Sequence, residues 1–160
     1  MAKEEQYKEL VAQVAAVVDG ETDMIANMAN VAAILHEAFG FWWTGFYRVI
    51  TPSDSPIRGE GKDERGVLVL GPFQGPLACT RIPFGKGVCG TAWAKNETII
   101  VPNVHEFAGH IACSSESNSE IVVPVRINDK VIAVLDIDSK EFDNFDEIDK
   151  KYLEEIIKLL

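Results

Sequence analysis

The sequence has few of the features that mark membrane, nucleic-acid-binding and disulfide-stapled proteins. No apolar run approaches the roughly 20 residues of a membrane span, and the charged residues 1–6 do not resemble a secretion signal. Fifteen Lys and Arg against 25 Asp and Glu leave a net charge of −10, which repels phosphate backbones and anionic lipids. Three cysteines are too few, and odd in number, for a disulfide framework. We therefore expect a cytoplasmic protein without nucleic-acid or membrane partners, whose cysteines are buried, bind metal or do redox chemistry.

The spacing of apolar residues predicts a single α+β domain over residues 1–160. Helical periodicity covers residues 5–18 and 22–38, where Ile25 belongs to the apolar stripe. A last helix opens with a capping box at Asp146 and Asp149 and points Ile148 inward. Strands are expected at 41–50, 67–70, 77–82, 98–101, 121–127 and 130–138, with a short helix at 88–95. Mostly hairpin-linked strands with helices packed against them describe an antiparallel sheet, with an exposed hairpin tip at 51–66 and a long loop at 102–120.

A glycine pattern at residues 85–90 matches the dinucleotide-binding motif G-x-G-x-x-G. That motif requires an early βαβ unit with a substantial helix and an acidic residue about 20 positions on. Here the helix is short and Asn103 stands where the next strand ends, so we interpret the glycines as a tight turn. Cys89 would lie near a helix N-terminus, where backbone N–H groups can lower a thiol pKa and favour Cys89 as a thiolate.

Three carboxylates are predicted to meet at one end of a hairpin. Asp136 and Asp138 point to the same face of an apolar strand, about 7 Å apart. Glu120 and these aspartates are about equally far from the turn at Asn128 and Asp129, so they share its open end. Like charges held together favour a cation between them, either a metal ion or a substrate ammonium.

The long loop contributes His105, His110 and Cys113. With Asp136 or Asp138 nearby, these residues offer a possible zinc site, although no C-x-x-C or H-E-x-x-H motif supports it. Alternatively, the histidines only form hydrogen bonds within the loop. Cys113 has polar neighbours, and a reachable thiol near an imidazole can ionise. The residues therefore indicate a cation site beside a thiol.

Five sequence blocks resemble the free methionine-(R)-sulfoxide reductases. They are LGPFQG at 70–75, GVCGT at 87–91, VHEFAGHIAC at 104–113, SEIV at 119–122 and LDIDS at 135–139. The three cysteines, ten and then 24 residues apart, also follow that family's order and spacing. The resemblance implies a GAF fold, a six-stranded antiparallel sheet flanked by N-terminal and C-terminal helices, and an α+β class that agrees with the pattern above.

The resemblance also implies roles for individual residues. Cys113 matches the cysteine that attacks the sulfoxide, Cys79 its usual disulfide partner and Cys89 a third relay thiol. The resemblance also implies five pocket residues. The carboxyl groups that bind the substrate's ammonium and sulfoxide are those of Glu120, Asp136 and Asp138. The aromatic wall around the substrate methyl group is formed by Trp43 and Tyr47. Ser114 stands where many members have Asp, which leaves the charge beside Cys113 open.

The implied reaction is the reduction of free methionine-(R)-sulfoxide to methionine. Cys113 attacks the sulfoxide sulfur, a carboxyl group donates a proton, and Cys113 becomes a sulfenic acid that Cys79 converts to a disulfide. Thioredoxin, with NADPH and thioredoxin reductase, is the implied external reductant, and the enzyme needs no bound cofactor or metal. The family also makes a homodimer plausible. The alternative function is a small-ligand-sensing GAF module without catalysis.

Overall fold

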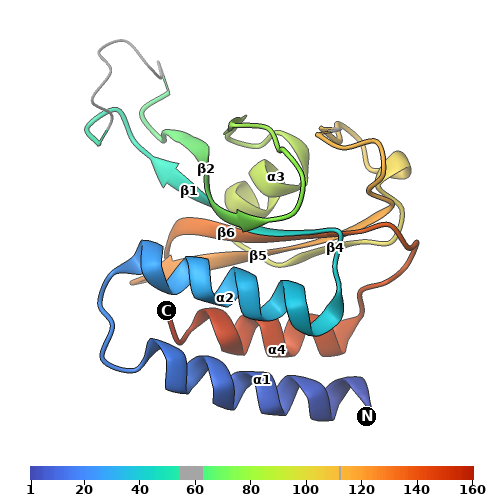
Figure 1. Cartoon of the computed structure of the whole chain (residues 1–160). Coiled ribbons are helices and arrows are strands. Elements are labelled where there is room, and N and C mark those ends of the chain that lie inside the picture. The colour runs from blue at the N-terminus through green and yellow to red at the C-terminus, as the bar shows by residue number, and fades with distance from the viewer. Residues whose placement is uncertain (55–62, 112) are drawn as a thin grey trace.

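A six-stranded antiparallel sheet forms the centre of the molecule in the computed structural model, which describes residues 1–54, 63–111 and 113–160 (Figure 1). The strand order is β3-β2-β1-β6-β5-β4. The strands are β1 (Trp43–Ile50), β2 (Val67–Gln74), β3 (Arg81–Pro83), β4 (Ile99–Val101), β5 (Ser119–Ile127) and β6 (Lys130–Ser139). The helices are α1 (Lys3–Val18), α2 (Met24–Phe39), α3 (Gly87–Lys95) and α4 (Glu147–Ile157), with a 3-10 turn, η1 (Val104–Glu106). This architecture confirms the predicted α+β fold.

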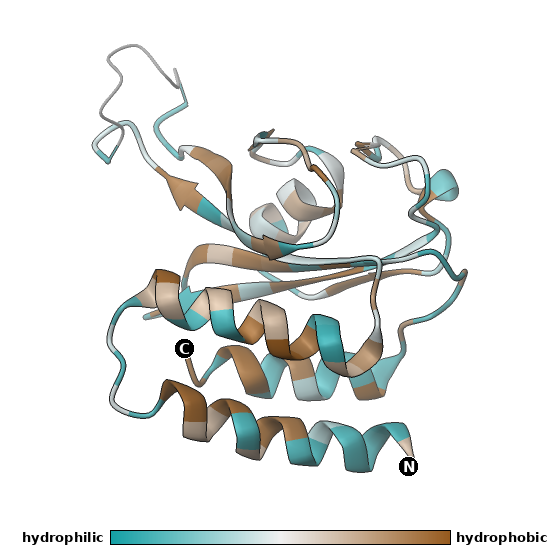
Figure 2. Ribbon diagram, viewed as in Figure 1, coloured by the Kyte–Doolittle hydropathy of each residue, from teal (hydrophilic) through white to brown (hydrophobic). Residues whose placement is uncertain are grey.

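The two faces of the sheet are covered differently. Helices α2 and α4 lie along one face, and α1 packs against them on the side away from the sheet, whereas α3 and the long loops lie on the other face (Figure 1). Successive side chains of a strand point to opposite faces, so Ile121 and Leu135 pack toward the three helices while Val122 and Val134 pack toward α3. The central strands are therefore largely hydrophobic, while the helices alternate hydrophobic and hydrophilic segments (Figure 2).

The ends of the helices follow from local sequence signals. The Asp23 side chain caps α2 by accepting from the Ala26 N–H at 2.9 Å, and Gly40 ends that helix with φ of 63°. The capping box of α4 forms as predicted between Asp146 and Asp149. None of the helices in the described ranges is both long and apolar enough to cross a bilayer.

Two predicted inward-facing side chains are on the outside. Ile25 is 42% exposed and Ile148 is 36% exposed. In α4 the buried face instead contains Asp149, which accepts hydrogen bonds from Tyr7 at 2.7 Å and from Lys3 at 2.7 Å. A carboxylate with two hydrogen-bond partners thus takes an inner position of α4, which apolar periodicity alone does not reveal.

The predicted strand at 77–82 was also wrong in extent. Strand β2 runs on to Gln74, and β3 contains only Arg81–Pro83. Gly75, with φ of 123°, and Pro76, which has no N–H to donate, end β2 and leave Leu77 90% exposed. A hairpin tip was predicted at 51–66, and residues 55–62 of it lie outside the described ranges. Strands β1 and β2, which flank this segment, pair with each other up to Ile50 and Val67.

Candidate functional site

The strand register places the three carboxyl groups in one patch. Asp138 of β6 pairs with Glu120 of β5 on one side and with Trp43 of β1 on the other. Asp136, two residues before Asp138, points to the same face. The convergence predicted from the hairpin is therefore present, on the face that α3 covers.

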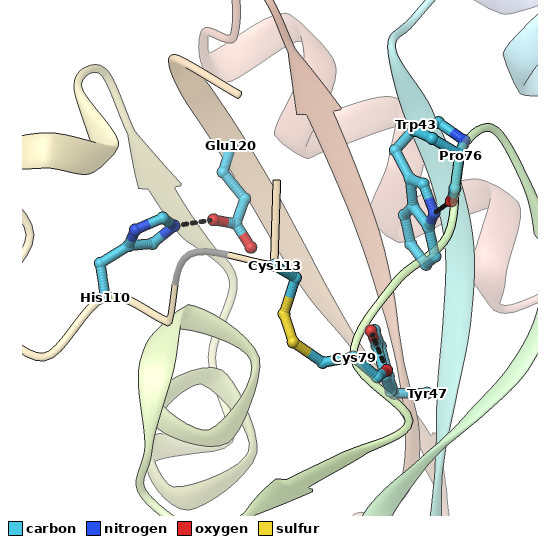
Figure 3. The surroundings of a disulfide bond; sticks show 7 residues. All are labelled: Trp43, Tyr47, Pro76, Cys79, His110, Cys113 and Glu120. Carbon is cyan, nitrogen blue, oxygen red and sulfur yellow. Dashed lines mark hydrogen bonds and ion pairs between the residues drawn. A yellow bond between two sulfur atoms is a disulfide. The ribbon is translucent and has the colours of Figure 1, made fainter. Parts of the chain in front are cut away.

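A cavity that is partly open to solvent lies above this patch. Two aromatic residues form one wall, where the rings of Trp43 and Tyr47 stack with centroids 5.9 Å apart. Trp43 Nε1 donates to the Pro76 carbonyl at 3.0 Å, and the Tyr47 hydroxyl donates to the Cys79 carbonyl at 2.8 Å (Figure 3). These bonds tie the aromatic wall to the segment that carries Cys79.

A disulfide between Cys79 and Cys113 lies at this cavity, with the two Cα atoms 5.5 Å apart (Figure 3). Both cysteines are half-buried. The predicted strand over residues 77–82 would have contained Cys79, but this cysteine lies in the irregular segment between β2 and β3. The disulfide therefore joins two loops at the cavity, and both of its cysteines are partly exposed to solvent.

The carboxyl groups are held in an environment that favours their neutral forms. Burial, followed by the charge of Asp138, raises the pKa of Glu120 well above its usual value. Burial and the charge of Glu120 also raise the pKa of Asp136 well above its usual value. The side chains of Glu120 and Asp136 hydrogen-bond each other, and this bond requires one of the two carboxyl groups to hold a proton. Burial and the charge of Asp136 raise the pKa of Asp138. The patch can therefore both store a proton and accept a cation.

Cys89 does not have the activated thiol that its position on α3 suggested. Burial, and then the charges of Asp136 and Glu120, raise its pKa well above the ordinary thiol value. It is 3% exposed and is not in a disulfide. Desolvation and neighbouring carboxylates outweigh the helix N-terminus, so the prediction that Cys89 is the thiolate was wrong.

The zinc set considered from the sequence is not assembled. Cys113 is in the disulfide, and His105 Nε2 lies 2.9 Å from the Asn118 side chain. His110 Nε2 instead lies 3.6 Å from Glu120 Oε2, and burial lowers the pKa of His110 (Figure 3). A different group, Cys89 with Glu120 and Asp136, has ligand atoms within 4.8 Å of one another.

Some residues of the site had no clear sequence signal. Ser117 is 5% exposed and hydrogen-bonds Asp138, which ties the Cys113 loop to the carboxyl patch. Trp42 Nε1 donates to Ser114 Oγ at 3.2 Å and holds the same loop. Gly45 lies under the Trp43 ring, where a Cβ atom would collide with the indole. A glycine inside a predicted strand was the only hint, since such residues often mark a close approach.

The glycine pattern at 85–90 is a tight turn, as interpreted from the sequence. Gly85 and Gly87 have φ of 74° and 61°. A Cβ on Gly90 would lie 2.5 Å from the Pro83 carbonyl oxygen, so this glycine allows α3 to start directly against β3. The motif is explained by packing, without a phosphate.

This chain is similar to known proteins over nearly its whole length. The family model described as the GAF domain matches residues 21–160. "GAF domain-containing protein A" of Dictyostelium discoideum is 53% identical over 99% of this chain and 92% of its own. "Free methionine-R-sulfoxide reductase" of Escherichia coli (strain K12) is 43% identical over 100% and 89%. The structure of the free methionine-R-sulfoxide reductase of Neisseria meningitidis in complex with its substrate is 52% identical, covers 99% and 88%, and superposes with a TM-score of 0.89.

Proposed function

Because this chain belongs to the GAF-domain family of the free methionine-R-sulfoxide reductases, we propose that it reduces free L-methionine-(R)-sulfoxide to methionine. The observation that carries the proposal is the Cys79–Cys113 disulfide beside the carboxyl patch. A sulfoxide reductase needs a thiol pair that can be oxidised and a proton source for the sulfoxide oxygen. Both lie at one cavity of this protein.

The substrate's α-ammonium binds at the carboxyl patch. Asp136 Oδ1 is buried without a hydrogen-bond partner in the described part of the chain, and a substrate N–H would supply one. Trp43 and Tyr47 then contact the apolar end of the substrate from the opposite wall. A free amino acid fits this arrangement because the carboxyl patch compensates the positive charge of its α-ammonium inside the cavity.

The chemistry starts at Cys113. Its thiolate attacks the sulfoxide sulfur, the S–O bond breaks, and the oxygen passes to Cys113 as a sulfenic acid while methionine leaves. Glu120 or one of the two aspartates protonates the oxygen, since their raised pKa values keep a proton available near neutral pH. Cys79 then attacks the sulfenic sulfur, which releases water and forms the disulfide.

An external dithiol closes the cycle. A thioredoxin-like protein, kept reduced by NADPH and thioredoxin reductase in the cytoplasm, opens the half-exposed disulfide. Cys89 is a relay thiol rather than the first nucleophile, because its raised pKa disfavours the thiolate. The homodimer stays a prediction.

A single-turnover experiment tests the thiol assignment. Reduced protein, given one equivalent of the R epimer without reductant, should release one methionine and form the Cys79–Cys113 bond, as read by peptide mapping. Cys79→Ser should still release one methionine and stop at a trappable sulfenic acid, whereas Cys113→Ser should release none. If Cys113→Ser releases methionine and Cys89→Ser does not, the nucleophile is misassigned. Binding of the sulfoxide without methionine release in the unmodified protein would favour the ligand-sensing alternative.

A further inference from the structure

The innermost wall of the cavity brings a thiol, two carboxyls and an imidazole together. The ligand atoms of Cys89, Glu120 and Asp136 lie within 4.8 Å of one another, and all three residues are buried. His110 Nε2 lies 3.6 Å from Glu120 Oε2. We propose that these four residues form a Zn²⁺ site, and that the ion inhibits the enzyme by excluding the substrate's ammonium. The inhibition rests on the proposed function, whereas the binding of zinc does not.

An unpartnered acceptor points to a ligand at this place. Asp136 is 6% exposed and lines the cavity, and its Oδ1 has no hydrogen-bond partner in the described ranges. A buried carboxylate oxygen without a partner is costly and is relieved by a cation. The substrate ammonium relieves it during turnover, and a metal ion relieves it between turnovers.

The mixture of donor atoms selects zinc over the hard cations. One sulfur, one imidazole nitrogen and two carboxylate oxygens suit tetrahedral Zn²⁺, whereas Mg²⁺ and Ca²⁺ prefer oxygen alone. In a tetrahedral site, zinc bonds of about 2.0 Å to oxygen and 2.3 Å to sulfur place two ligand atoms about 3.3–3.5 Å apart. The side chains of Cys89, Glu120 and Asp136 therefore have to approach one another by up to about 1.5 Å, and His110 has to turn toward them from beside Glu120.

Occupancy by zinc and by substrate is mutually exclusive. The ion would take oxygens of Glu120 and Asp136 that the ammonium requires, and it would displace the protons of the Cys89 thiol and the carboxyls to solvent. No electrons are transferred in this step. The site does not involve Cys79 or Cys113, so binding of the ion does not require either of these cysteines to be reduced.

Cobalt titration tests the site directly. In Cys79→Ser/Cys113→Ser protein, Cys89 is the one remaining thiol, so a thiolate-to-Co²⁺ absorption band in the near ultraviolet reports its coordination. We expect one Co²⁺ per chain, displaced by Zn²⁺. Adding Cys89→Ser should abolish the band, and Glu120→Gln or His110→Ala should weaken binding at least about 10-fold. His105→Ala, which alters a histidine outside the group, is the matched control and should leave the affinity unchanged.

The same double variant tests exclusion, because it lacks the attacking cysteine and cannot consume the sulfoxide. Free methionine-(R)-sulfoxide should erase the cobalt band. Absence of the band, or equal metal affinity after Cys89→Ser, would overturn the metal site. A band that survives saturating sulfoxide would overturn the inhibition. Failure of the proposed function would appear separately, as absence of methionine release from the unmodified, metal-free protein.

Discussion

Removing the positive charge of the substrate should abolish most of the activity. N-acetylation of methionine-(R)-sulfoxide replaces the ammonium with a neutral amide, which leaves Glu120 and Asp136 buried without their cation. Breaking a buried ion pair in this way costs about 3–5 kcal/mol. Because the pKa values of both carboxyls are already raised, a proton can partly replace the ammonium, and the loss lies near the lower end. A cost of about 3 kcal/mol corresponds to a fall in kcat/KM of more than about 100-fold.

The assay compares initial rates of methionine release from the two substrates. N-methylated methionine-(R)-sulfoxide is the control, since it adds bulk at the same nitrogen and keeps the charge. In Asp136→Asn protein the acetylation penalty should shrink by about 0.5–3 kcal/mol, because one of the charges that the ammonium compensates is gone. Equal kcat/KM for free and acetylated substrate, or a penalty unchanged in Asp136→Asn, would refute binding of the ammonium at this patch.

Two further predictions concern stability. Gly90→Ala should lower the free energy of unfolding by about 1–3 kcal/mol in a denaturant titration, because a Cβ there meets the Pro83 carbonyl oxygen at 2.5 Å; unchanged stability would show that α3 is free to shift away from β3. Glu120→Gln should gain stability relative to the unmodified protein as pH rises from 5 to 8. Folding raises the pKa of Glu120, so the unmodified protein loses stability as pH rises from the unfolded pKa through the raised folded value, and Gln does not titrate. Thermal melts of both proteins across that range measure the difference, and a difference that is the same at both ends would contradict a raised pKa.

Local signals predicted much of the fold. The periodicity of α1 and α2, the capping box of α4 and the apolar runs of β5 and β6 depend on neighbouring residues, so they could be identified from the sequence. The turn at Asn128 and Asp129 also placed Glu120 and Asp138 at the same end of the hairpin. That they pair and share a face depends on a register shift between Val125 and Arg126, which the sequence did not reveal. The resemblance to a known family supplied the pairing of Cys79 with Cys113, which no local pattern contains.

The state of each site group was decided by tertiary packing. Proximity to a helix N-terminus predicted a low pKa for Cys89, but two carboxyls from β5 and β6 come to lie beside its thiol and reverse the shift. Gly45 lies against the nearby indole of Trp43 and also against Phe73, which is distant in sequence. Ser117 gains its role only from the distant Asp138. Sequence determines which side chains share a strand face, since that geometry repeats every two residues. The burial and the pKa of each thiol or carboxyl group depend on which side chains of other helices and strands pack against that face. Only the folded chain determines them.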